Sequence, residues 1–187
     1  MAHSRHMLRV LASLLVCTPA LASEGDPKAI STATDRAFSR QKYTPVLRMM
    51  THRMAYMREH MAQAVATRGR WSSEASSALG PTFLACIKDT GERAYVRVAC
   101  ARAAVALRAP SADDAIIQAM ADVDRESRYW LAESLFETAT PNAIAELNRH
   151  LDDDDVMLAT AARQWLAQHN ARVSKRSAPK DHDGGAP

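Results

Sequence analysis

Aromatic residues and glycine are scarce in this sequence, and it has no runs of valine, isoleucine and threonine. Phe, Trp and Tyr together make up 5% of the 187 residues, and 6 residues are glycine. β-Sheets are built mainly from β-branched and aromatic side chains, whereas alanine, which is abundant here, has the highest helix propensity. The composition therefore argues against a sheet and predicts an all-α protein.

The sequence also lacks the motifs that mark catalytic and nucleotide-binding sites. It has no Gly-x-Ser-x-Gly motif, no glycine-rich phosphate loop and no Cys-x-x-Cys pair. The aspartates at 152–155 are consecutive, whereas calcium loops alternate their carboxylates and include a glycine. We expect this run to cap the helix that follows it. These absences predict a protein that is not an enzyme and uses no cofactor.

The first 22 residues have the three parts of a secretory signal peptide. Arg5 and Arg9 provide the positive start, residues 8–16 form a core that is apolar apart from Arg9 and Ser13, and residues 20–22 read Ala-Leu-Ala. The apolar core is shorter than the roughly 20 residues that span a bilayer. We therefore expect cleavage after Ala22 and a periplasmic or secreted product.

Removal of residues 1–22 leaves a nearly neutral chain. Two arginines and no acidic residue leave with this segment, so the 24 Lys and Arg fall to 22, against 21 Asp and Glu. Nucleic-acid binding needs a clustered basic surface, and the balance argues against it. No second hydrophobic stretch is long enough for a transmembrane segment.

The remaining chain divides into three parts. Residues 23–40 form a polar segment that ends in a short helix from Ile30 to Arg40. Residues 41–170 are predicted to be a helical domain that starts with one long helix from Tyr43 to Arg68, ended by Gly69. Residues 171–187 are basic and then rich in Pro, Asp and Gly, so we expect a disordered tail.

Three helical segments within 41–170 align at a constant offset of 31 residues. Each contributes small or apolar residues at four-residue steps, which place them on one helix face. The aligned sets are Val96, Cys100 and Ala104; Ser127, Leu131 and Leu135; Leu158, Ala162 and Leu166. Shorter helical segments precede them. A repeat of 20–50 residues is typical of solenoids, so we predict an α-solenoid of about three helix pairs.

The repeated segments resemble HEAT repeats, in the short variant found in phycobilisome lyases. The family pattern of a turn aspartate, Val-Arg and then small residues with Ala-Leu matches Asp122, Ser127-Arg128, Leu131-Ala132 and Ser134-Leu135, and again Val96-Arg97. The resemblance covers about residues 78–170. It implies a helical-repeat scaffold that binds other proteins, and it names no partner.

Methionine and histidine cluster in the predicted long helix. Met50, Met54, Met57 and Met61 are spaced by four, three and four residues, which is typical of a seam that packs against a neighbouring helix. We interpret them as core residues. The alternative is a copper site, because thioether and imidazole ligands from these methionines, His52 and His60 suit Cu(I). Burial of the seam distinguishes the two.

Cys86 and Cys100 are the cysteines that remain after the predicted cleavage. An oxidising compartment favours a disulfide between them. However, the predicted stagger along the two helices is about 6 Å, on top of a helix separation of about 8–10 Å. A disulfide needs Cα atoms within about 7 Å. The geometry favours two buried thiols, and a disulfide is the alternative.

The sequence thus predicts an exported, non-enzymatic helical-repeat protein that acts as a protein–protein interaction module. An adaptor, an inhibitor of another exported protein and a component of an envelope complex all fit this class. A periplasmic copper-binding protein that uses the Met/His segment 49–61 is the alternative function.

Overall fold

The computed structural model describes residues 26–69 and 71–177, which form nine α-helices and no strand. This confirms the all-α prediction, while the predicted signal peptide at 1–22 lies outside the described residues. The helices are α1 (Pro27–Ser39), α2 (Thr44–Met50), α3 (Ala55–Arg68), α4 (Ser73–Lys88), α5 (Ala94–Ala106), α6 (Ala112–Met120), α7 (Arg125–Thr138), α8 (Pro141–Arg149) and α9 (Val156–Ser177).

Side-chain caps set the start of several helices. Ser72, Asp124 and Thr140 each accept a hydrogen bond from a backbone N–H in the first turn of α4, α7 and α8. Such caps satisfy donors that have no partner within the helix. In the aspartate run, the Asp155 carboxylate accepts from the N–H groups of Met157 and Leu158. The predicted capping role of the run is therefore confirmed at Asp155.

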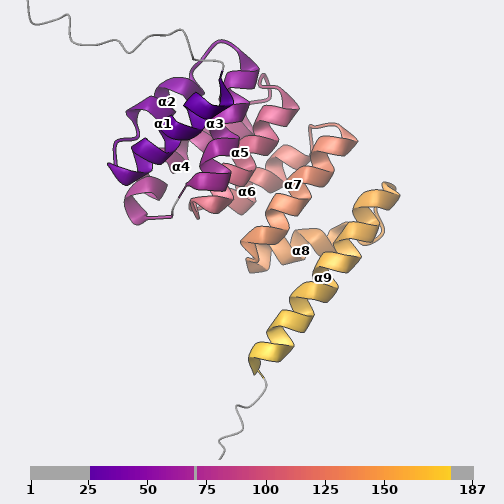
Figure 1. Ribbon diagram of the computed structural model, residues 1–187. Helices are drawn as coiled ribbons and strands as arrows, with labels where there is room; N and C mark the ends of the chain where they lie inside the picture. The colour runs from indigo at the N-terminus through magenta and orange to yellow at the C-terminus, as the bar shows by residue number, and fades with distance from the viewer. Residues whose placement is uncertain (1–25, 70, 178–187) are drawn as a thin grey trace, which may run out of the picture.

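The helices lie in two layers (Figure 1). In one layer α3, α5, α7 and α9 contact one another in that order, and in the other α2, α4, α6 and α8 do so. Contacts between consecutive helices join the layers, and α1 packs on α2 and α3. The core between the layers contains the fully buried side chains of Phe83, Ile87, Ile116, Leu131, Leu135 and Leu147.

All nine positions that align at the 31-residue offset are buried. Their exposed fractions run from 0% for residues such as Cys100 and Leu131 to 8% for Ser127 and Leu166. The four-residue steps therefore identify the faces of α5, α7 and α9 that pack into the core, as expected from the helical period.

The prediction of one long helix from Tyr43 to Arg68 is wrong, because the chain leaves helical geometry at residues 51–54. The Nδ1 atom of His52 accepts a hydrogen bond from the N–H of Met54, and the Arg58 guanidinium donates to the carbonyl of His52. Side chains that bond to nearby backbone groups compete with the helical hydrogen bonds. The result is two helices, of which α3 ends at Gly69 as predicted.

Two predicted boundaries also differ. α1 begins at Pro27 rather than Ile30, because the Asp26 carboxylate caps it and Pro27 suits the first helical position. The tail predicted to be disordered from residue 171 is helical as far as Ser177, because α9 continues through it. Lys175 and Arg176 in the last turn stabilise the end of α9, because their positive charges interact favourably with the negative end of the helix dipole. Residues 178–187 lie outside the described part.

Candidate functional site

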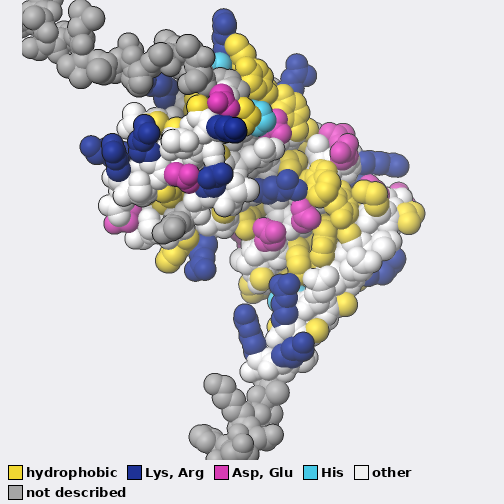
Figure 2. All heavy atoms as spheres, in the orientation of Figure 1, with side chains coloured by type: hydrophobic (Ala, Val, Ile, Leu, Met, Phe, Trp, Pro, Cys, Tyr) yellow, Lys and Arg dark blue, Asp and Glu magenta, His cyan; other side chains and the backbone are white. Residues whose placement is uncertain are grey.

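An open groove of about 440 Å³ lies across α3, α5 and α7. Its floor is formed by small and apolar side chains of α5, those of Ala94, Val98 and Ala99. Side chains of α3 and α7 form the two walls. Figure 2 shows this face, with hydrophobic side chains gathered over α7 and the adjoining part of α5 and charged side chains among them.

Two large aromatic side chains line this groove and remain exposed. Tyr95 of α5 is 46% exposed and Trp130 of α7 is 36% exposed. The Arg102 guanidinium lies 5.1 Å from the centroid of the Trp130 ring, and Tyr129 contacts the same indole edge-on. Trp, Tyr and Arg are the residues that contribute most often to binding energy at protein interfaces. The groove therefore has the composition of a binding surface.

The charges that line the groove are mostly acidic. Glu59, Asp124 and Glu126 contribute carboxylates, and Arg102 contributes the one cation among the described residues that line it. The Arg102 guanidinium is already paired with Glu133, at 2.9 Å. Hydrogen bonds from the backbone N–H and hydroxyl of Ser127 hold the pKa of Asp124 below its usual value, so this carboxylate stays ionised at neutral pH.

The same face continues toward the C-terminus. A second hollow, of about 520 Å³, is lined by Tyr129 of α7 and by residues of α9 that include Met157 and Ala161. Met157 and Ala161 occupy the positions of Tyr95 and Ala99, displaced by two offsets of 31 residues. Equivalent positions on α5 and α9 therefore each line a hollow.

Arginine–carboxylate pairs join successive helix pairs away from this groove. The guanidinium of Arg97 lies 2.9 Å from Asp122, and that of Arg128 lies 3.5 Å from Asp153. Both partners of the second pair follow those of the first by 31 residues. Arg97 is buried, and its Nε also donates to the carbonyl of Ile87 at 2.7 Å.

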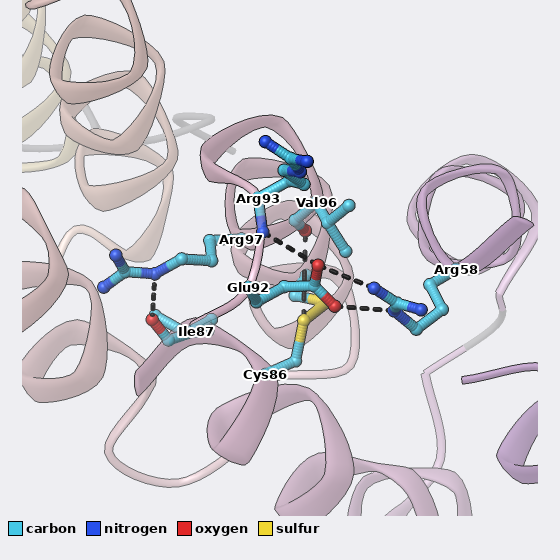
Figure 3. Close-up of a disulfide and its surroundings, with 8 residues drawn as sticks. Arg58, Cys86, Ile87, Glu92, Arg93, Val96 and Arg97 are labelled. Atoms are coloured by element: carbon cyan, nitrogen blue, oxygen red, sulfur yellow. Dashed lines mark hydrogen bonds and ion pairs between the residues drawn. A yellow bond between two sulfur atoms is a disulfide. The ribbon is translucent and has the colours of Figure 1, made fainter. Parts of the chain in front are cut away.

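A third pair joins α3 to the loop after α4 (Figure 3). The Arg58 guanidinium donates to both carboxylate oxygens of Glu92, at 2.6 and 2.7 Å. Partial burial opposes the ionisation of Glu92, but the hydrogen bonds from Arg58 and from the Arg93 backbone outweigh it and hold the pKa of Glu92 below its usual value. Bidentate pairs of this kind are the strongest charge-assisted contacts.

Cys86 and Cys100 form a disulfide between α4 and α5, with Cα atoms 6.3 Å apart. The preference for two buried thiols is therefore wrong. That preference treated the helices as cylinders at an average separation. Ala103 and Ala104, one helical turn after Cys100, are buried on α5 and allow a closer approach, because they have no side chain beyond Cβ.

Reduction of this disulfide should lower the free energy of unfolding by about 3 kcal/mol, since it reopens a loop of about 15 residues in the unfolded chain. Denaturant unfolding with and without reductant measures the difference. The Cys86→Ala/Cys100→Ala variant is the control and should not respond to reductant. Equal stability of the wild-type protein in both conditions would contradict a structural role for the bond.

The methionines of the predicted seam do not stay together. Met50, Met57 and Met61 are buried, as predicted, and the Met61 sulfur accepts a hydrogen bond from the Thr34 hydroxyl at 3.6 Å. Met54 is 38% exposed and lies between α2 and α3, so its place in the seam is wrong. The four-three-four spacing places these methionines on one face only if the helix is continuous. Because the helix is interrupted at 51–54, Met54 does not lie on the same face as the others.

The histidines proposed for copper are held by other contacts. The His60 ring contacts Tyr56 edge-on at a centroid distance of 6.1 Å, and His52 accepts from the backbone at Met54. Within 26–69 and 71–177, no three His, Cys, Asp or Glu side chains are grouped so that they could hold a metal ion. No observation favours the copper hypothesis, and it stays an untested prediction.

The groove residues were not anticipated from the sequence. Tyr95 and Trp130 fall outside the aligned positions that are buried. Arg102 and Glu133 are separated by one 31-residue offset, and this spacing is the signal that could have indicated a contact between α5 and α7 beside the groove.

Among the described helices, none has the length and apolar character needed to cross a membrane. Comparison of the chain with models of protein families, with curated proteins and with solved structures finds no match.

Proposed function

We propose that this chain is an exported, non-enzymatic helical-repeat protein that acts as a protein–protein interaction module. Its partner binds in the groove between α3, α5 and α7. The observation that carries the proposal is the pair of exposed aromatic side chains, Tyr95 and Trp130, on a floor of small residues. Exposed aromatic side chains around a concave surface are characteristic of interaction sites.

Repeated contacts support a HEAT-like α-solenoid as the scaffold. The helices of each layer contact one another in chain order, as they do in stacked helix pairs. In addition, an arginine follows the first aligned position of α5 and of α7, and each pairs with an aspartate in the turn before the next helix of the same layer. These pairs are Arg97–Asp122 and Arg128–Asp153. Solenoids of this type present extended surfaces to other proteins.

Export is supported by the disulfide. Structural disulfides form and persist mainly in oxidising compartments, which agrees with the signal-peptide pattern of residues 1–22. The mature protein in the cell envelope or medium should therefore begin at Ser23, as measured by its intact mass. A cytoplasmic product that retains Met1 and has reduced Cys86 and Cys100 would contradict export.

Photocrosslinking in the native cells tests the binding surface. A photoreactive phenylalanine analogue placed at Tyr95 should crosslink a partner protein, because this side chain lies in the groove. The same analogue at Glu74, an exposed position on α4 outside the groove, should not. Equal crosslinking at both positions, or none at Tyr95, would contradict binding in the groove.

The crosslinked partner then allows a quantitative test. Trp130→Ala should weaken its affinity about thirtyfold, since truncation of a central aromatic residue at an interface costs about 2 kcal/mol or more. Trp71→Ala is the matched control, because Trp71 is also exposed and also lies under an arginine, Arg108, at 4.7 Å. Trp71 does not line the groove, and its loss should leave the affinity unchanged.

A further inference from the structure

The carboxylates of the groove lack cationic partners within the described part of the protein. Glu59 accepts a hydrogen bond from the Gln63 amide at 2.8 Å, which is a neutral donor. Glu126 is exposed in the first turn of α7 and takes part in no ion pair between residues 26–69 and 71–177. A neighbouring chain that enters the groove therefore meets two carboxylates that form no ion pair with the described residues of this protein.

Arg102, the cation among the described residues that line the groove, does not neutralise these carboxylates, because it already forms an ion pair elsewhere. Arg102 is paired with Glu133 and lies over one face of Trp130. The groove is therefore negative, although the chain as a whole has more Lys and Arg than Asp and Glu. Complementary charge selects binding partners, since a like charge placed in the same position is repelled.

The aromatic side chains add a second preference for a cation. The contact of Arg102 with Trp130 shows that this indole accepts a guanidinium on its face, as expected from the negative potential of the ring. Tyr95 presents a further exposed ring in the groove that Glu126 also lines. The floor formed by Ala94, Val98 and Ala99 contributes apolar area.

On these grounds we infer that the partner segment is basic: an exposed peptide stretch of another protein in which Lys or Arg alternate with apolar side chains. Its cations pair with Glu59 and Glu126 and stack on Tyr95 or Trp130, and its apolar side chains lie on the α5 floor. This inference rests on the proposed function and specifies the chemistry of its partner.

Selection from a displayed library of short random peptides tests the inference with the purified, disulfide-bonded protein. The peptides retained should contain more Lys and Arg than Asp and Glu, together with apolar residues. A synthetic fluorescent copy of the most enriched peptide then gives a Kd by anisotropy. Replacement of its Lys and Arg by Glu should weaken binding at least about tenfold.

A matched pair of double variants locates the effect. Glu59→Gln/Glu126→Gln should weaken the basic peptide about tenfold or more, and Glu74→Gln/Glu137→Gln, which changes the net charge equally outside the groove, should not. Binding of the basic peptide should also weaken as salt rises to about 0.15 M, where the Debye length is about 8 Å.

Three results would overturn the inference: enrichment of acidic or uncharged peptides, equal loss in both double variants, or no peptide binding at all. Crosslinking at Tyr95 decides the proposed function separately. If a partner crosslinks at Tyr95 through an acidic or uncharged segment, the proposed interaction module is supported and the inference of a basic partner segment is wrong.

Discussion

Replacement of Asp122 by alanine should lower the free energy of unfolding by about 3 kcal/mol, an unusually large effect for a loop residue. The reason is its partner. The Arg97 side chain is 4% exposed, whereas Asp122 is 39% exposed, so the substitution leaves a buried guanidinium whose remaining contact is the neutral carbonyl of Ile87. Removal of the partner of a buried charge leaves that charge uncompensated.

A double-mutant cycle separates this cause from a local change in the loop. Arg97→Met fills the same space without a charge, so the Arg97→Met/Asp122→Ala variant should be more stable than the sum of the single changes by about 1–3 kcal/mol. The exposed pair Arg102–Glu133 is the control, since exposed pairs contribute about 1 kcal/mol or less. Strict additivity at Arg97 and Asp122 would show that the pair does not couple the repeats.

Replacement of Leu131 by alanine should lower the free energy of unfolding by about 2–5 kcal/mol. Leu131 is fully buried on α7, which packs against α5 and α9 in its own layer and against α6 and α8 in the other. The substitution removes apolar contacts and leaves a cavity that helices packed on every side cannot fill completely. Denaturant unfolding provides the measurement.

Glu137→Ala on the same helix is the control for this cavity effect. Glu137 is exposed, and exposed substitutions of this kind change stability by about 0.5 kcal/mol or less. If the two variants were equally stable, the inward face of α7 would be assigned wrongly, and with it the 31-residue alignment that identified Leu131.

The inferred basic partner and the two stability predictions concern different faces of the same two helices, α5 and α7. Arg97 and Leu131 face the interior and the loops, whereas Tyr95 and Trp130 face the groove. Variants of the groove residues should therefore change binding while the protein remains folded. This separation lets a loss of affinity in Trp130→Ala be attributed to the surface rather than to unfolding.

The sequence by itself determined the helical class and the residues that face the core. Helical periodicity depends on local geometry and side-chain polarity, which are properties of short segments. For this reason the nine aligned positions are all buried, and capping residues such as Asp124 and Thr140 stand where helices begin.

Only the tertiary structure decided which side chains meet across helices. The separation of Cys86 from Cys100 depends on how closely α4 and α5 approach, and the break at 51–54 is stabilised in part by Arg58, whose guanidinium also reaches Glu92 in a distant loop. The groove likewise requires α3, α5 and α7 to lie side by side. Such contacts depend on the relative placement of whole helices, which is set by the packing of the entire core and cannot be read from any one segment.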